Sequence, residues 1–316
     1  MPTAQIIAVI GSTGQQGSGV VSALLSSTLF SVRALTTNPL SDKAQALLTK
    51  HADAVENGRF EVVEGNLQDG DSLVKAFEGC YGLFAAWMSY GDEVAEGKAL
   101  VDAAKATGIE HFVYSSLPSI KELSGGQLTR CTVVEAKAPI ERYAREQLAA
   151  VTALLPGGFF SNFGLPLYTK RSDDGTVVFH PPFNSSTIFE MLDESYDVGV
   201  FAAAIFNKGP QAMSGKSYPV GGKTTSIADL ATEYGELTGD EVVYEERVLD
   251  EVPEMTGWPT HVRESLGDLF KWAEQRRPGK ICYGSMAPEE DTSFEDLGVR
   301  ASTMKEWLDR TGFRVK

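Results

Sequence analysis

The sequence predicts an α/β protein built on a doubly wound parallel sheet, followed by a smaller α/β C-terminal subdomain on the substrate side. Apolar segments of strand length alternate with helical segments over the first half of the chain, and a glycine-rich turn follows the first strand directly. Such alternation forms βαβ units, whose right-handed crossovers give a parallel sheet with helices on both faces.

Six apolar segments have the length and composition of strands buried on both faces of a sheet. They span residues 4–10, 32–36, 60–64, 81–87, 111–115 and 151–155. Helical segments lie between them at 17–27, 41–50, 71–78, 93–107 and 132–148. Ser41 is an N-cap residue for the second helix, and Gly108 ends the fourth.

The pattern becomes less regular after Pro156, where two glycines follow. Helices are expected at 195–206, 226–237 and 301–311, and a strand at 241–247. We therefore expect a nucleotide-binding domain over 1–156 and a smaller subdomain over 157–316, whose chain is free to cross back to the sheet. Whether the segment from Asp250 to Lys316 caps the cleft or binds a partner stays open.

The chain is acidic, with 43 Asp and Glu against 28 Lys and Arg and a formal net charge of -15 over 316 residues. Such a surface repels phosphate backbones and anionic lipids, so we expect no direct nucleic-acid or membrane binding. It would attract a basic protein partner. Apolar runs are too short to span a bilayer and no basic N-terminal region precedes the first strand, so a cytoplasmic setting is expected.

The cysteines and histidines are spaced too irregularly for a disulfide framework or a metal site, so no metal is predicted. They are Cys80, Cys131 and Cys282, and His51, His111, His180 and His261.

The glycine-rich turn is Gly11-Ser12-Thr13-Gly14-Gln15-Gln16-Gly17. Gly11 permits the tight turn, Gly14 lets the backbone approach a pyrophosphate, and Gly17 allows close helix–strand packing. The helix that follows offers free N–H groups to phosphates. Because the turn joins an apolar strand to a helix in a series of βαβ units, it predicts a Rossmann dinucleotide site.

The end of the second strand indicates which dinucleotide binds. NAD-selective sites usually place a carboxylate there, whereas this chain has Thr37 and Asn38. Arg33 lies within the strand, and Lys43, in the next helix, is a candidate for reaching a 2′-phosphate. We therefore expect NADP(H); the alternative for Lys43 is a solvated surface charge.

The fifth strand ends at Ser115 and Ser116, at the sheet edge where ligands bind. Lys137 lies on the next helix. A short-chain dehydrogenase would carry its proton-donating Tyr four residues before this lysine, but Val133 occupies that position. Lys137 is then expected at the nicotinamide ribose, or as the acid/base if burial lowers its pKa, with Ser116 beside it.

Further cofactor contacts are expected where other strands end. They are Asn66, Ala86, Trp87, Gly158, Phe160 and Asn162. The aromatic residues after the sixth strand would wall a nicotinamide and substrate pocket, with Asn162 as its polar group. The alternative for these aromatic residues is core packing.

Several motifs together resemble the NmrA-like family of atypical short-chain dehydrogenases, up to about residue 247. They are Val9–Gly17, Gly91–Ala95, Val113–Pro118, Glu135–Tyr143, Pro156–Phe163, Asp174–Thr176 and Tyr196–Gly199. The resemblance implies a Rossmann domain and a smaller C-terminal part with a cleft between them. Some members are redox-sensing regulators; others, similar to isoflavone reductases, are NADPH-dependent and keep the Lys without the Tyr. Thr37 departs from the Arg of many NADP-binding relatives.

Two hypotheses follow. The first is an NADP(H)-dependent oxidoreductase that reduces a small carbonyl, enone or aromatic metabolite. The second is a non-catalytic NADP(H) sensor that binds a basic regulatory protein, such as a zinc-finger transcription factor. Lys137 and the aromatic loop favour the enzyme, while Val133 favours the sensor. We favour the enzyme, and expect a monomer or a homodimer.

Overall fold

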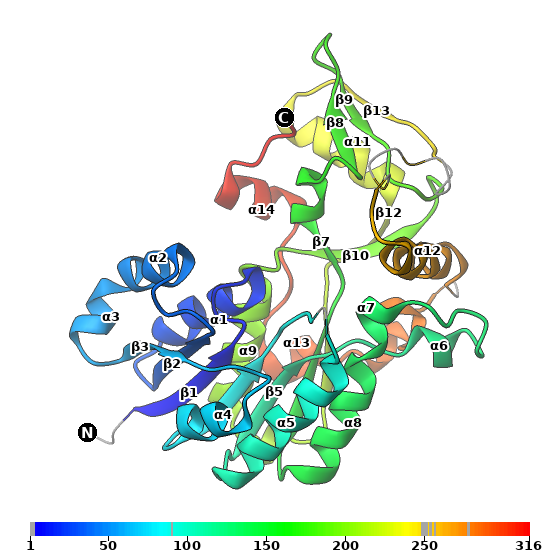
Figure 1. Ribbon diagram of the computed structural model, residues 1–316. Coiled ribbons are helices and arrows are strands. Elements are labelled where there is room, and N and C mark those ends of the chain that lie inside the picture. Colours follow the sequence, from blue (N-terminus) through cyan, green and yellow to red (C-terminus); the bar gives the residue numbers. More distant parts are fainter. Residues whose placement is uncertain (1–3, 90, 248–251, 253–254, 256, 277–278) are drawn as a thin grey trace.

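The computed structural model describes residues 4–89, 91–247, 252, 255, 257–276 and 279–316. Its centre is a seven-stranded sheet, parallel throughout, in the order β11-β6-β5-β4-β1-β2-β3 (Figure 1). The strands are β1 (Gln5–Ile10), β2 (Phe30–Thr36), β3 (Phe60–Glu64), β4 (Gly82–Ala85), β5 (His111–Ser115), β6 (Val151–Pro156) and β11 (Ser217–Val220). The predicted Rossmann sheet is confirmed, with its switch point between β1 and β4.

Helices cover both faces of this sheet. On one face lie α1 (Gln15–Leu25), α2 (Asp42–Lys50) and α9 (Asp197–Lys208); on the other lie α4 (Gly70–Phe77), α5 (Glu93–Ala106) and α8 (Lys137–Gln147). Alternate residues of β1 serve the two cores: Ile7 and Val9 pack toward α1, and Ala8 and Ile10 toward α5. This burial on both faces explains why the strand is apolar from Ile6 to Ile10.

The chain leaves the sheet after β6 and returns to it with α9 and β11. Helix α9 packs against α1 where two glycines meet: a Cβ at Gly199 would lie 2.4 Å from the Gly19 carbonyl oxygen. The sequence analysis had no strand at 217–220, because four residues that include Pro219 carry little periodicity. The central sheet and the helices that cover it, which we call the Rossmann layer, therefore include elements from both sides of residue 156.

Pro139 divides the predicted helix over 132–148 into α7 (Thr132–Glu135) and α8. Proline has no N–H to donate to the Glu135 carbonyl, and the next bond, from Ile140 N–H to the Ala136 oxygen, is long at 3.4 Å. The predicted strand over 241–247 shortens to β13 (Val242–Tyr244).

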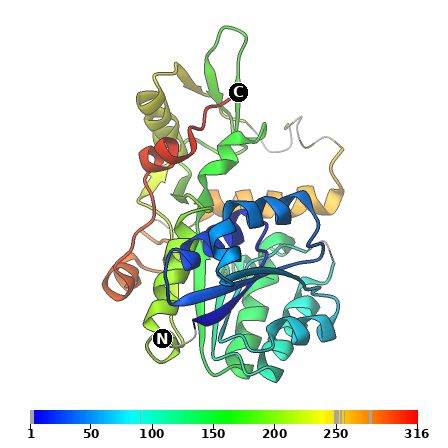
Figure 2. The ribbon, with the colours of Figure 1, turned by 90° about the vertical axis from the view of Figure 1, so that its left-hand side faces the viewer.

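The C-terminal part carries two small sheets, in the orders β12-β10-β7 and β13-β9-β8. Their other strands are β7 (Gly158–Phe159), β8 (Thr169–Arg171), β9 (Val177–Phe179), β10 (Ile188–Leu192) and β12 (Thr224–Ser226). An aromatic core joins them to α11 (Ile227–Thr238) and α14 (Met304–Thr311). Helix α12 (Thr260–Gln275) lies between this part and the Rossmann layer (Figures 1 and 2).

The remaining helices are short. They are α3 (Ala52–Glu56), α6 (Ile120–Leu123), α10 (Pro210–Met213) and α13 (Ser293–Leu297), with 3-10 turns at Phe160–Gly164, Cys282–Gly284 and Pro288–Glu290. Within the described part of the chain, no helix has the length and apolar character needed to cross a membrane.

Candidate cofactor and active site

The glycine-rich turn connects β1 to α1 with the geometry that a phosphate-binding turn needs. Gly11 has φ +73°, and a Cβ there would lie 1.9 Å from the Ala86 carbonyl oxygen. A Cβ at Gly17 would lie 2.2 Å from the Gly11 oxygen. Helix α1 begins without a side-chain cap and without an acidic residue in its first turn. Its first N–H groups and its dipole are therefore free for an anion, so this turn fits a dinucleotide pyrophosphate.

Polar side chains tie the turn to three neighbouring elements. Ser12, fully buried, donates from Oγ to the Leu35 oxygen of β2 at 2.8 Å. Ser115, at the end of β5, donates to Oε1 of Gln16 at 2.7 Å. Gln15 donates to Oγ of Ser161 at 3.1 Å, across to the C-terminal part. The Ser12 hydroxyl is thus structural, whereas the Thr13 side chain is partly exposed and makes no hydrogen bond within the described residues.

The end of β2 exposes Thr37 and Asn38, as predicted, and β2 brings no carboxylate to this edge. The Asn38 side-chain oxygen accepts from Leu40 N–H at 3.0 Å, which fixes the loop. Lys43 is exposed in the first turn of α2 and has no ion pair among the described residues. The strand register adds Glu64, which pairs with Thr36 and which the sequence analysis did not consider.

Arg33 is not brought to the phosphate turn. Its guanidinium pairs with Glu61 at 2.6 Å and donates to the carbonyls of Ala76 and Glu78. These partners hold Nε and Nη1 on the α4 side of β2, so the structure does not place Arg33 among the predicted cofactor contacts. Asn66 follows β3, and its side-chain oxygen accepts from Gln68 N–H at 3.0 Å.

Lys137 is buried at the start of α8, with an exposed fraction of 8%. Its Nζ pairs with Oε1 of Glu93 at 2.5 Å, donates to the Trp87 carbonyl oxygen, and lies 5.0 Å from the centre of the Trp87 ring. Burial lowers the pKa of Lys137, and the Glu93 carboxylate opposes that shift. The sequence analysis missed Glu93, although it is the first residue of a helix that follows β4.

Three buried polar atoms at the carboxyl ends of β4 and β5 have no hydrogen-bond partner within the described residues. They are Trp87 Nε1, the Tyr114 hydroxyl and Ser116 Oγ. Burial raises the pKa of Tyr114 well above its usual value, so the hydroxyl stays protonated. Unsatisfied buried donors are costly, which indicates that another molecule supplies their partners.

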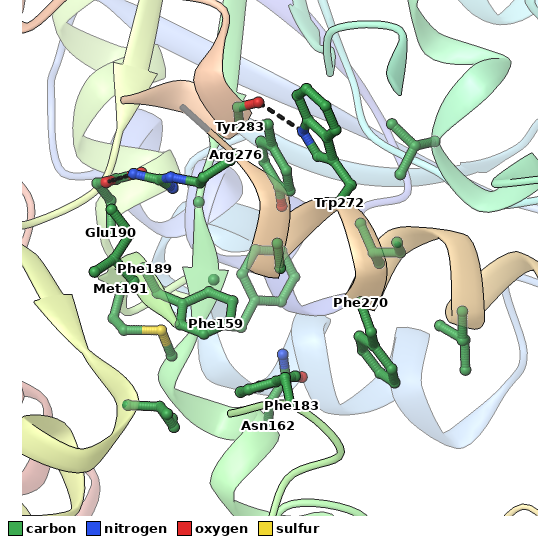
Figure 3. Close-up of a pocket in the computed structure, with 18 of the residues that line it drawn as sticks. Phe159, Asn162, Phe183, Phe189, Glu190, Met191, Phe270, Trp272, Arg276 and Tyr283 are labelled. Atoms are coloured by element: carbon green, nitrogen blue, oxygen red, sulfur yellow. Dashed lines mark hydrogen bonds and ion pairs between the residues drawn. The ribbon is translucent and has the colours of Figure 1, made fainter. Parts of the chain in front are cut away.

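A cavity of about 350 Å³, drawn in Figure 3, is lined by residues that neighbour members of this cluster in the chain. Met88 and Leu117, which follow Trp87 and Ser116 in the chain, line one part of it. Its walls are mostly apolar and include Phe159, Phe163, Phe183, Phe189, Met191 and Phe270. Of the residues predicted after the sixth strand, Gly158 and Asn162 line the cavity. Phe160 does not: it is buried and stacks on Trp307, 5.2 Å between ring centres.

Helix α12 closes one side of the cavity with Leu266, Leu269 and Phe270. It is anchored on the Rossmann side, where Asp268 accepts from the Arg130 N–H at 2.8 Å and Ser265 Oγ from the Val133 N–H at 3.2 Å. The sequence analysis missed this helix, although its apolar residues recur at helical spacing. Part of the segment after Asp250 thus covers the cavity; Asp250 itself lies outside the described residues.

In the described part of the chain, no group of three or more His, Cys, Asp or Glu side chains is placed to hold a metal ion.

Comparison with known proteins agrees with this geometry. The family model of the NmrA-like family matches residues 3–308. The chain belongs to the NmrA-like family. The predicted resemblance is thereby confirmed, over more of the chain than the quoted motifs covered.

Named relatives of both kinds are similar to this NmrA-like chain. An NmrA-like family domain-containing oxidoreductase, FrzB of Cladobotryum sp, is 28% identical and aligns with 92% of this chain and 89% of its own. The nitrogen metabolite repression protein nmrA of Emericella nidulans is 29% identical over 75% of this chain and 67% of its own.

Solved structures share the fold. The complexes of NmrA, a negative transcriptional regulator, with NAD and with NADP superpose with TM-scores of 0.80 and 0.79. Each is 25% identical and covers 98% of this chain and 95% of its own. An NADPH-dependent quinone oxidoreductase of Escherichia coli has a TM-score of 0.73 at 20% identity, covering 97% of this chain and all of its own. That last likeness concerns the fold alone.

Proposed function

We propose that this NmrA-like protein is an NADP(H)-dependent oxidoreductase that reduces a small carbonyl, enone or aromatic metabolite. The observation that carries the proposal is the apolar cavity, which is lined by Met88 and Leu117, the residues directly after Trp87 and Ser116, and by Val133 and Val134, one turn before Lys137. A family of named oxidoreductases and NAD(P)-bound structural relatives supports a nicotinamide cofactor.

The fit of the cofactor rests on residues of this chain. The N–H groups after Gly14 would hold the pyrophosphate, and the exposed edge at Thr37 and Asn38 would hold the adenosine ribose. Lys43 would supply a positive charge for a 2′-phosphate. When bound, a reduced nicotinamide supplies a hydride.

The polar cluster has the properties that a reduction of C=O requires. As hydride reaches the carbon, the substrate oxygen gains negative charge and then a proton. Ser116 Oγ is a buried hydroxyl with no acceptor, and Lys137 carries an ammonium in a site that excludes water. Ser116 would donate a hydrogen bond to that oxygen. Lys137 would hold the ribose, or stabilise the oxyanion and supply the proton.

The test is turnover with matched variants. Because Lys137→Met alone would leave Glu93 buried without its partner, the variant is Lys137→Met with Glu93→Gln. At saturating NADPH we expect it to lose turnover of an aromatic enone or quinone by at least about a hundredfold, within the range of acid–base catalysis. Lys98→Met, at an exposed lysine of the neighbouring helix, should leave turnover unchanged. Full turnover in the double variant would remove Lys137 from its role.

A regulator is the second candidate, and two observations favour it. The Lys137 ammonium is already held by Glu93 and the Trp87 carbonyl, and Val133 stands where a proton-donating Tyr would be. The similarity to the nitrogen metabolite repression protein supports the same function. Such a regulator would bind NADP(H) without consuming it, and would change its affinity for a basic partner protein with cofactor state. NADPH binding without oxidation across a panel of carbonyls and quinones would favour it.

We further propose a cytoplasmic location, because the three cysteines are free and buried as thiols. A net charge of -15 argues against direct nucleic-acid binding. We propose a monomer or homodimer, which light scattering after gel filtration would test.

A further inference from the structure

Two polar side chains line the cavity near the end of α12, and we call them its polar end. They are Tyr283, in the turn after α12, and Arg276, at the end of α12. In Figure 3 the Tyr283 ring points toward the aromatic rings of the cavity, whereas the Arg276 side chain extends to Glu190.

The backbone at Tyr283 is strained. Cys282 and Tyr283 have φ +55° and +57°, and among the described residues they alone adopt positive φ without being glycine. They occupy the centre of a tight turn, which the Gly284 N–H to Ile281 oxygen bond closes at 3.0 Å. A non-glycine residue with positive φ lowers the stability of the fold by about 1 kcal/mol or more, so it persists where the surrounding structure holds it. Strain of this kind at a cavity wall indicates a functional side chain.

Two contacts hold the strained turn in place. Trp272 Nε1, on α12, donates to the Tyr283 carbonyl oxygen at 2.8 Å, and this bond is drawn in Figure 3. Cys282 packs beneath Ala153 and Leu155 of β6. The backbone of the turn is therefore fixed from both sides, and the Tyr283 ring is left at the cavity.

The Tyr283 hydroxyl has no hydrogen-bond partner among the described residues. A Phe ring would fill the same space, so packing does not account for the hydroxyl. Burial raises the pKa of Tyr283 above its usual value, so the hydroxyl keeps its proton at neutral pH.

Arg276 supplies a second free donor. Its Nη atoms bind Glu190, at 3.0 and 2.5 Å, but its Nε is buried without a partner. Glu190 also accepts from Thr224 Oγ1 at 2.7 Å. Because the Arg276 charge is neutralised by Glu190, this end of the cavity carries donors but no net charge.

We propose that Tyr283 and Arg276 are recognition residues for a neutral acceptor oxygen, a ketone or ether, on an aromatic ligand of this cavity. The polar end selects for that oxygen, and its lack of net charge disfavours a carboxylate. This inference rests on the proposed function only in taking the cavity as the substrate site.

The test compares two bicyclic probes that differ by one acceptor, 1-tetralone and tetralin. Binding of each is measured by calorimetry to the protein saturated with NADP⁺, so that no reduction occurs. The variant Tyr283→Phe keeps the ring and removes the hydroxyl. Tyr143→Phe, at a tyrosine of α8 whose hydroxyl bonds Asp102, is the matched control.

We expect Tyr283→Phe to weaken 1-tetralone binding about five- to tenfold, as the loss of one hydrogen bond implies, and to leave tetralin within twofold. Tyr143→Phe should change neither. Three results would overturn the proposal. Tyr283→Phe could weaken the binding of both probes equally, it could change the binding of neither probe, or the wild type could fail to bind 1-tetralone. Because no turnover is measured, the proposed function can fail while this selectivity holds, or the reverse.

Discussion

Replacing Gly17 by Ala tests how the phosphate turn is built. An added Cβ would lie 2.2 Å from the Gly11 oxygen and 2.6 Å from the Gly11 carbonyl carbon, against 3.4 Å for ordinary contact. Both atoms belong to the backbone, so no side-chain rotation relieves the clash. The turn or the start of α1 must move by about 1.2 Å, the difference between ordinary contact and the 2.2 Å separation.

Two effects on stability oppose each other. Ala is favoured over Gly inside a helix by about 1 kcal/mol, whereas overpacking of this kind costs about 1–3 kcal/mol. We therefore expect a net loss of about 1 kcal/mol in the free energy of unfolding. The affinity for NADPH should fall more strongly than the stability. Losing one hydrogen bond to a charged group costs about 1.5–3 kcal/mol, which is roughly 10- to 100-fold in affinity.

Gly70 gives a matched control. It is the first residue of α4, and an added Cβ there meets nothing within 4 Å. Gly70→Ala should retain or slightly raise stability, and should not change NADPH affinity. The assays are urea unfolding and calorimetric titration with NADPH. Wild-type affinity and stability in Gly17→Ala would refute the reasoning, since the clash at Gly11 would then carry no consequence.

Three further predictions concern charges. Lys43→Ala should weaken NADP(H) about three- to tenfold and leave NAD(H) unchanged, as titration at low salt would measure. Glu93→Gln removes the counter-charge of buried Lys137 and should lower the free energy of unfolding at pH 7 by about 3 kcal/mol; because the pKa of Lys137 then falls further, the deficit should shrink by pH 9. Asp296→Asn should cost about 1 kcal/mol at pH 7, since hydrogen bonds from Lys216 and others lower the pKa of Asp296 to about 2.

The direction of the Asp296 effect follows from linkage. A carboxyl whose pKa is lowered by folding contributes stability above its unfolded pKa, and loses that contribution as the pH falls toward the folded value. The difference between wild type and Asp296→Asn should therefore be constant near neutrality and shrink below pH 4. A difference that grows with acidity would contradict this account.

The other two predictions have their own refuting outcomes. An equal loss of NAD(H) and NADP(H) binding in Lys43→Ala would remove the role assigned to Lys43. A stability deficit of Glu93→Gln that does not change with pH would mean that Lys137 does not titrate in that range.

The Rossmann sheet and its phosphate turn could be predicted from the sequence alone. Strands β4, β5 and β6 are buried along their whole length, so their composition is mostly apolar, whereas the edge strand β3 buries only Phe60. The turn is also local: Gly11 and Gly17 are needed because of atoms within a few residues or on the adjacent strand. The position of Thr37 and Asn38 at the carboxyl edge of the sheet could also be predicted, because both residues come directly after the second strand.

Which side chains meet depends on how distant elements pack in the folded chain. Arg33 lies in the right strand, but its guanidinium is taken by Glu61 and the α4 end, so it is not at the cofactor edge. Lys137 was predicted at the site, yet its partner Glu93 comes from another helix. Tyr283 and Phe159 of β7 both line the cavity, although they are more than a hundred residues apart in the chain. Periodicity records which face of an element is buried, whereas a pair of contacting side chains depends on how distant elements pack, and no local pattern encodes that.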